Sequence, residues 1–103
     1  MKDFQSMIRQ AQEMQSRLAK LQEEMAEKTV EASSGGGMVT VTVNGRQEVL
    51  SVRIEKEVIS PDEAELLQDL VRAAVNEALL RSREMMSAEM AKITGGLSFP
   101  GMS

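Results

Sequence analysis

The sequence predicts an α+β fold with a long N-terminal helix, a three-stranded antiparallel sheet containing an Asn-Gly hairpin, and a long C-terminal helix. Three observations predict it. Residues 2–28 carry an apolar stripe at heptad spacing, residues 29–59 contain alternating β-branched runs, and residues 60–93 begin with a helix cap and continue with a wide apolar face. The length of 103 residues fits one domain. We place that domain at residues 1–96 and a flexible C-terminal tail at residues 97–103.

The N-terminal helix is predicted by apolar residues that recur at alternating intervals of three and four. These residues are Phe4, Met7, Ala11, Met14, Leu18, Leu21 and Met25. Such spacing gives one narrow apolar stripe along a helix. The flanking positions carry few opposed charges, whereas an isolated parallel zipper normally has more. We therefore expect the stripe to pack on another helix of this fold, from the same chain or from a second one.

The sheet is predicted by alternation around Asn44-Gly45, because Asn-Gly between alternating runs is the strongest short hairpin signal. With these two residues at the centre of a type I′ turn, Val43 faces Arg46, Val41 faces Glu48, and Val39 faces Leu50. One face of the hairpin is then apolar and carries Val39, Val41, Val43, Leu50, Val52 and Ile54. Helices must cover that face.

The C-terminal helix is predicted to begin at Ser60-Pro61-Asp62-Glu63. Ser60 serves as the N-cap, Pro61 suits the first helical position, and Glu63 completes a capping box. A wide apolar face follows at helical spacing, made of Leu66, Leu67, Leu70, Val71, Ala74, Val75, Ala78 and Leu79. Gly95-Gly96 ends the pattern.

The predicted helices are longer than one small sheet can cover. At 1.5 Å per residue they measure about 40 Å and 50 Å, whereas a compact domain of this size has a radius of gyration of about 13 Å. A homodimer would cover the rest, since two-fold pairing is the commonest assembly. We expect the core and dimer contacts to come from Met14, Leu18, Leu21, Val39, Val41, Leu50, Val52, Leu67, Leu70 and Ala74.

The composition excludes several classes of function. The chain has no Cys and no His, so it has no disulfide framework, thiol nucleophile, imidazole base or Cys/His metal site. Two Phe with no Trp or Tyr make a base-stacking platform for single strands improbable. We predict no enzyme, no cofactor, no metal and no small-molecule substrate. The sequence also lacks a signal-peptide pattern and a membrane-length apolar run, which favours an intracellular protein with no membrane partner.

Three other features allow a functional reading and a plainer one. Ser34-Gly35-Gly36-Gly37 could cradle a phosphate, but no P-loop lysine follows, and a strand connection is the simpler interpretation. The many carboxylates fit solvated helix faces better than an acid/base pair. The methionines of the first helix fit ordinary seam packing, whereas Met85, Met86 and Met90 lie on a sparse face and fit a binding groove equally well.

The basic residues are distributed unevenly along an acidic chain of net charge −4. Residues 61–77 carry −4, whereas residues 1–20 carry +2 and residues 78–103 carry +1. We expect both helix ends near the sheet to be acidic and both far ends to be basic. Salt screens charges beyond about 8 Å, so basic tips could attract phosphate despite the acidic body. The candidate DNA-binding residues are Lys2, Arg9, Arg17, Lys20, Arg81, Arg83 and Lys92.

Three ordered stretches resemble the YbaB/EbfC family of nucleoid-associated proteins. They are GGGMVTVTVNG at residues 35–45, DLVRAAVNEA at residues 69–78, and TGGL at residues 94–97 with Pro100-Gly101. The resemblance implies a tweezer-like homodimer, in which two short sheets form a central body and long helices project from it. It also implies binding of double-stranded DNA with little sequence preference, in the nucleoid and cytoplasm.

A protein-binding module is the alternative. Helix, hairpin and helix is also the plan of prefoldin-like holdases, whose coiled-coil tips grip apolar surface. Met85, Met86 and Met90, with Leu97 and Phe99 in the tail, would supply such a tip.

Overall fold

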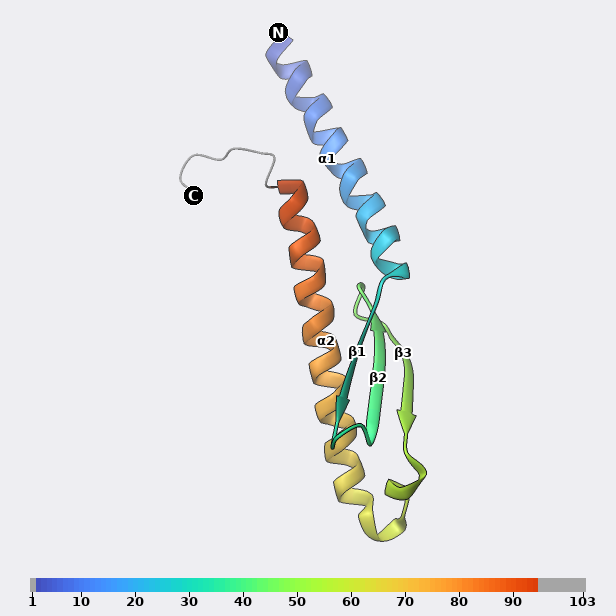
Figure 1. Ribbon diagram of the computed structural model, residues 1–103. Coiled ribbons are helices and arrows are strands. Elements are labelled where there is room, and N and C mark those ends of the chain that lie inside the picture. The colour runs from blue at the N-terminus through green and yellow to red at the C-terminus, as the bar shows by residue number, and fades with distance from the viewer. Residues whose placement is uncertain (1, 95–103) are drawn as a thin grey trace, which may run out of the picture.

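The computed structural model describes residues 2–94, with Lys2 and Thr94 described by their backbone alone. Helix α1 spans Lys2–Glu27, strands β1, β2 and β3 span Thr29–Ser34, Val39–Asn44 and Val49–Ile54, and helix α2 spans Ala64–Thr94. Two short 3-10 helices, η1 (Lys56–Val58) and η2 (Pro61–Glu63), join β3 to α2. The described chain is elongated, measuring 72 × 27 × 16 Å (Figure 1). The predicted fold is confirmed, and the predicted tail at residues 97–103 lies outside the described residues.

One face of the antiparallel sheet β1-β2-β3 packs on the first half of α2 (Figure 1). The core joins three valines of β2 to small residues of α2: Val39, Val41 and Val43 on one side, Ala74 and Ala78 on the other, all with no exposed surface. The alanines let the helix axis approach the strands closely. Strand β3 lies at the edge, where α2 does not cover it, and Leu50 and Val52 are 54% and 45% exposed.

The predicted hairpin register is wrong by four residues. Val39 pairs with Ile54 and Val41 with Val52, and a bulge places Val43 opposite Val49. The turn also differs, because the left-handed φ of 63° is at Gln47 and neither Asn44 nor Gly45 has a positive φ. The predicted face nevertheless holds for Val39, Val41, Val52 and Ile54, because a slip by an even number of residues leaves each side chain on its side of the sheet.

The reason for the different turn is the side chain of Asn44, which is only 2% exposed. Its Oδ1 accepts hydrogen bonds from the Arg46 and Glu48 N–H groups at 2.9 and 3.0 Å. Its Nδ2 donates to the Ala26 carbonyl at 3.2 Å and to Glu48 Oε1 at 2.8 Å. Asn44 therefore ends strand β2 and supports a longer turn, instead of occupying the turn centre.

Helix α1 packs on the second half of α2 beyond the sheet, but only through its own C-terminal half. Leu21 and Met25 are 4% and 0% exposed, and Met14 and Leu18 are half-buried. Phe4 and Met7 are 63% and 65% exposed, because α1 projects past the end of α2 (Figure 1). The N-terminal part of the predicted stripe therefore has no partner within one described chain.

The start of the C-terminal helix has the predicted N-cap but not the predicted capping box, because Glu63 donates its N–H to the Ser60 carbonyl at 3.0 Å and not to the Ser60 hydroxyl. Ser60 Oγ accepts a hydrogen bond from the Asp62 N–H at 3.3 Å, and Pro61 occupies the first position. The first turn is 3-10, and the α-helix begins at Ala64. Of the predicted core residues on α2, Ala74 is buried, whereas Leu67 and Leu70 are half-buried against the core.

Candidate nucleic-acid interface

The candidate site is a groove of about 210 Å³ between α1 and the last turns of α2. Three of the predicted DNA-binding residues line it: Arg17 and Lys20 from α1, and Lys92 from α2. Leu21 and Ile93 form its floor, and Glu24 and Glu89 also line it. The two helices run in opposite directions (Figure 1), which brings residues 75 positions apart in the sequence into one groove.

The cations of this groove differ in how far they are neutralised. Lys92 and Lys28 both donate to Glu89 Oε1 at 3.2 Å, and these bonds lower the pKa of the Glu89 carboxyl. Arg17 and Lys20 are exposed, and neither forms an ion pair within the described part of the chain. The Arg17 guanidinium and the Lys20 ammonium, about one helical turn apart, are thus available for an anionic ligand.

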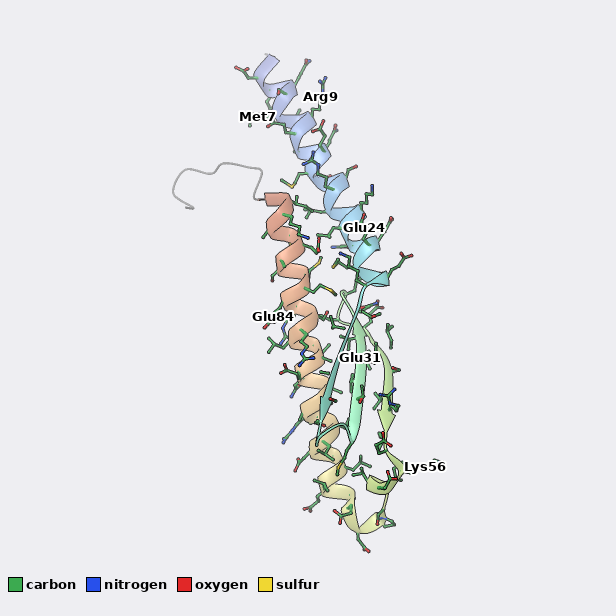
Figure 2. The ribbon with its side chains drawn as sticks, viewed as in Figure 1. Met7, Arg9, Glu24, Glu31, Lys56 and Glu84 are labelled. Carbon is green, nitrogen blue, oxygen red and sulfur yellow. The ribbon has the colours of Figure 1, made fainter. Side chains whose placement is uncertain are left out.

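The structure distributes the other predicted basic residues over α1 and α2. Arg9 lies on the projecting part of α1 (Figure 2), and Arg83 is exposed on α2. The side chain of Lys2 lies outside the described residues. Arg81 is the exception to the predicted arm location, because its Nη1 donates to the Glu31 carbonyl of β1 at 2.6 Å and its Nε pairs with Glu77 at 3.3 Å. It lies beside the sheet.

The predicted separation of acidic and basic ends holds for α2 but not for α1. Glu24, which lies in the acidic end of α1 and is labelled in Figure 2, lines the same groove as Arg17 and Lys20. The reason is that α1 ends beside the second half of α2, whereas the acidic start of α2 lies at the opposite pole of the molecule (Figure 1). The carboxylates of the first turns of α2 are therefore remote from the groove, whereas Glu89, near the end of the same helix, lines it.

Two residues that position the groove were missed from the sequence. Ser82 has no exposed surface, and its Oγ donates to the Asn44 carbonyl at 2.7 Å. Gly45 donates its N–H to the Met25 and Lys28 carbonyls at 2.8 and 3.0 Å. Hydrogen bonds at Asn44 and Gly45 therefore tie the end of α1 to the hairpin and to α2. The signal that could have revealed Ser82 is the series of small residues Ala74, Ala78 and Ser82, four apart on the buried face.

Residues 3–93 contain no cluster of acidic side chains suited to a metal ion. No helix in the described part of the chain combines the length and apolarity needed to span a membrane. The methionines of the alternative protein-binding tip are partly covered: Met85 and Met86 are half-buried, and Met90 is 38% exposed. Leu97 and Phe99 of that tip lie outside the described residues.

Comparison with known proteins gives consistent matches along the whole chain. A nucleoid-associated protein of Syntrophobacter fumaroxidans is 56% identical over 95 residues, which cover 92% of this chain and 86% of that protein. One from Thermoanaerobacter pseudethanolicus is 53% identical over 100 residues, covering 97% and 90%. The crystal structure of an uncharacterized Helicobacter pylori protein has the same fold, with a TM-score of 0.75 at 24% identity over 82% of this chain and 89% of that one.

The family comparison agrees with these relatives. The family model that matches, over residues 1–97, is that of the YbaB/EbfC DNA-binding family. The chain therefore belongs to the YbaB/EbfC DNA-binding family.

Proposed function

We propose that this protein is a nucleoid-associated protein that binds double-stranded DNA through the groove between α1 and α2, by contact with phosphates and without reading sequence. The observation that carries the proposal is the pair of unpaired cations, Arg17 and Lys20, beside Lys92. Phosphate contacts supply affinity that does not depend on base sequence. Arg9, Arg83 and Lys2 extend the basic surface along the helices.

Two copies of the chain would form the binding unit. The helix-side face of β3 carries exposed Val52 beside fully buried Val41, because α2 covers β1 and β2 but not the edge strand. The radius of gyration is 19.9 Å, against about 13 Å for a compact domain, and a partner would cover apolar side chains that this extended chain leaves exposed, such as Phe4 and Met7. Two-fold pairing would also give the dimer two grooves for one duplex.

The test of DNA binding is an anisotropy titration with two duplexes of unrelated sequence at several salt concentrations. Three cations in each of two chains would neutralise about six phosphates, giving a slope of log affinity against log salt of about −5. Both duplexes should bind alike. Replacing Arg17 and Lys20 together by Gln gives a variant that we call the groove variant. Its slope should be less steep by about 1.8 per chain. Absence of binding at low salt, or binding that ignores salt, contradicts the proposal.

A matched control removes two charges from the opposite pole of the molecule. Lys56 lies on η1 (labelled in Figure 2), Arg72 lies on the first half of α2, and both are exposed. The Lys56→Gln, Arg72→Gln variant has the same net charge as the groove variant. We expect it to bind DNA as the unchanged protein does, because the lost charges lie several screening lengths from the groove. Equal weakening by both variants would show a net-charge effect and no specific groove.

The dimer is tested separately by sedimentation equilibrium. Val52→Lys places a charge on the apolar face of β3, and Ser51→Lys places the same charge one residue away on the other face. We expect a dimer for the unchanged protein and for Ser51→Lys, and dissociation for Val52→Lys. A monomer at micromolar concentration for the unchanged protein contradicts the dimer while leaving the groove proposal to the DNA titration.

The alternative of a protein-binding tip predicts the opposite sensitivity. Alanine in place of Met85, Met86 and Met90 should then abolish suppression of aggregation of an unfolded client protein, and the groove variant should have no effect. If the protein instead binds DNA through the groove, the groove variant should lose DNA affinity and the methionine substitutions should leave that affinity unchanged.

A further inference from the structure

The outer face of the sheet, opposite α2, carries a polar row that no helix of the described chain covers. Ser33, Thr40 and Arg53 are cross-strand neighbours on β1, β2 and β3. Directly paired residues share a face, and adjacent strands lie about 4.8 Å apart. Two hydroxyls and a guanidinium therefore stand side by side on the exposed surface of the sheet.

These residues surround a surface depression of about 400 Å³ that is completed by Arg81. Arg81 extends from α2 past the free edge of β1, where its Nη1 donates to the Glu31 carbonyl at 2.6 Å and its Nε to Glu77 at 3.3 Å. These two bonds hold the guanidinium in place and leave its remaining N–H groups to a ligand, because the guanidinium has five donors. Arg53 has no ion-pair partner between residues 3 and 93.

One carboxylate, that of Glu31, lines the depression. Glu31 Oε1 accepts a hydrogen bond from Thr42 Oγ1 at 3.3 Å, in the neighbouring cross-strand row. The depression thus offers two hydroxyls and two guanidinium groups, of which Arg81 is paired with Glu77 and Arg53 is unpaired within residues 3–93, beside the still charged carboxylate of Glu31. This set of donors suits a phosphate group, which accepts several hydrogen bonds and favours the planar fork of Arg.

We propose that Arg53 and Arg81, with Ser33 and Thr40, bind a phosphate of the same duplex that occupies the groove, so that the DNA path continues from the helices onto the outer face of the sheet. The inference rests on the proposed function, because it assigns the phosphate to that duplex. Arg81 connects the two sites: it lies 11 residues before Lys92, which is three helical turns, about 16 Å, along the same face of α2.

The first experiment is the salt titration repeated with Arg53→Gln. Arg53 is exposed and the substitution breaks no hydrogen bond of the described chain, so folding should be unaffected. We expect a slope less steep by about 0.9 per chain and affinity about tenfold weaker, as for one charge-assisted contact. Arg53→Lys should keep the slope but lose part of the affinity, because lysine cannot form the fork. Arg72→Gln is the charge-matched control and should change neither quantity.

The results separate the two proposals. If Arg53→Gln binds as the unchanged protein while the groove variant is weakened, the sheet site is refuted and the groove function stands. If the unchanged protein does not bind duplex DNA, the proposed function fails and takes the duplex assignment with it.

A second measurement follows the amide NMR signals of Ser33 and Thr40 in the full chain. Titration with a short duplex and, separately, with inorganic phosphate should shift both signals, and Arg53→Gln should remove both shifts. Shifts with inorganic phosphate alone would overturn the duplex as the source of the phosphate. No shift with either ligand would overturn the site itself.

Discussion

Replacing Asn44 by Ala should lower the free energy of unfolding by about 2–4 kcal/mol. The side chain is 2% exposed and makes four hydrogen bonds, to two backbone N–H groups of the turn, to the Ala26 carbonyl and to the Glu48 carboxylate. Each such bond contributes about 0.5–1.5 kcal/mol, and more when one partner is charged. Arg46 and Glu48 are exposed, so water replaces part of the loss, which keeps the total below the simple sum.

The measurement is urea unfolding followed by circular dichroism at one fixed protein concentration. With a slope of about 1.5 kcal/mol per M, the midpoint should fall by about 2 M. Asn76→Ala is the matched control, because Asn76 is exposed on α2 and its side chain makes no hydrogen bond within residues 3–93; its midpoint should change by less than about 0.3 M. An equally small change for Asn44→Ala would refute the argument that the side chain of this residue joins α1 to the hairpin.

Two further predictions concern packing and charge. Gly35→Ala should destabilise more than Gly36→Ala: both have φ above 60°, but a Cβ at Gly35 would lie 2.7 Å from Leu70 Cδ2, whereas nothing lies within 4 Å at Gly36. Similar urea midpoints for the two would contradict this. The lowered pKa of Glu89 means that its stabilising contribution exists at neutral pH and is lost as the pH falls through that pKa. Lys92→Met should raise it toward the ordinary value in a carboxyl NMR titration; no rise would refute the assigned cause.

The helices were predictable from the sequence because their signals are local. The alternating spacing of α1 and the Ser60-Pro61 cap of α2 each lie within a few turns of the element that they define. The hairpin register was not predictable in the same way. Asn44 is held at the end of β2 because its side chain donates a hydrogen bond to the Ala26 carbonyl and its own carbonyl accepts one from Ser82 Oγ. These partners lie in α1 and α2, far from the hairpin in the sequence.

The candidate site was predictable in part. Arg17 and Lys20 are one turn apart on any helix, so their proximity follows from α1 alone. Their approach to Lys92 depends on where α2 leaves the sheet, and that point is set by the close packing of Ala78 and Ser82. The location of Arg81 beside β1 follows from the same packing. We predicted that Arg81 lies on a projecting arm from the expected lengths of the helices, and these lengths contain no information about its contact with β1.

Local carboxylates should decide the potential of the groove more than the net charge of −4 does. Glu24 lines the groove with Arg17 and Lys20, whereas Glu65 lies 27 residues before Lys92, about 40 Å along α2 and roughly five screening lengths away. Glu24→Gln should therefore strengthen DNA binding about two- to fivefold, the range of an exposed charge contact. Glu65→Gln, which changes the net charge equally, should leave binding unchanged. Equal strengthening by both substitutions in the anisotropy titration would mean that the whole molecule, and not the groove, sets the attraction for DNA.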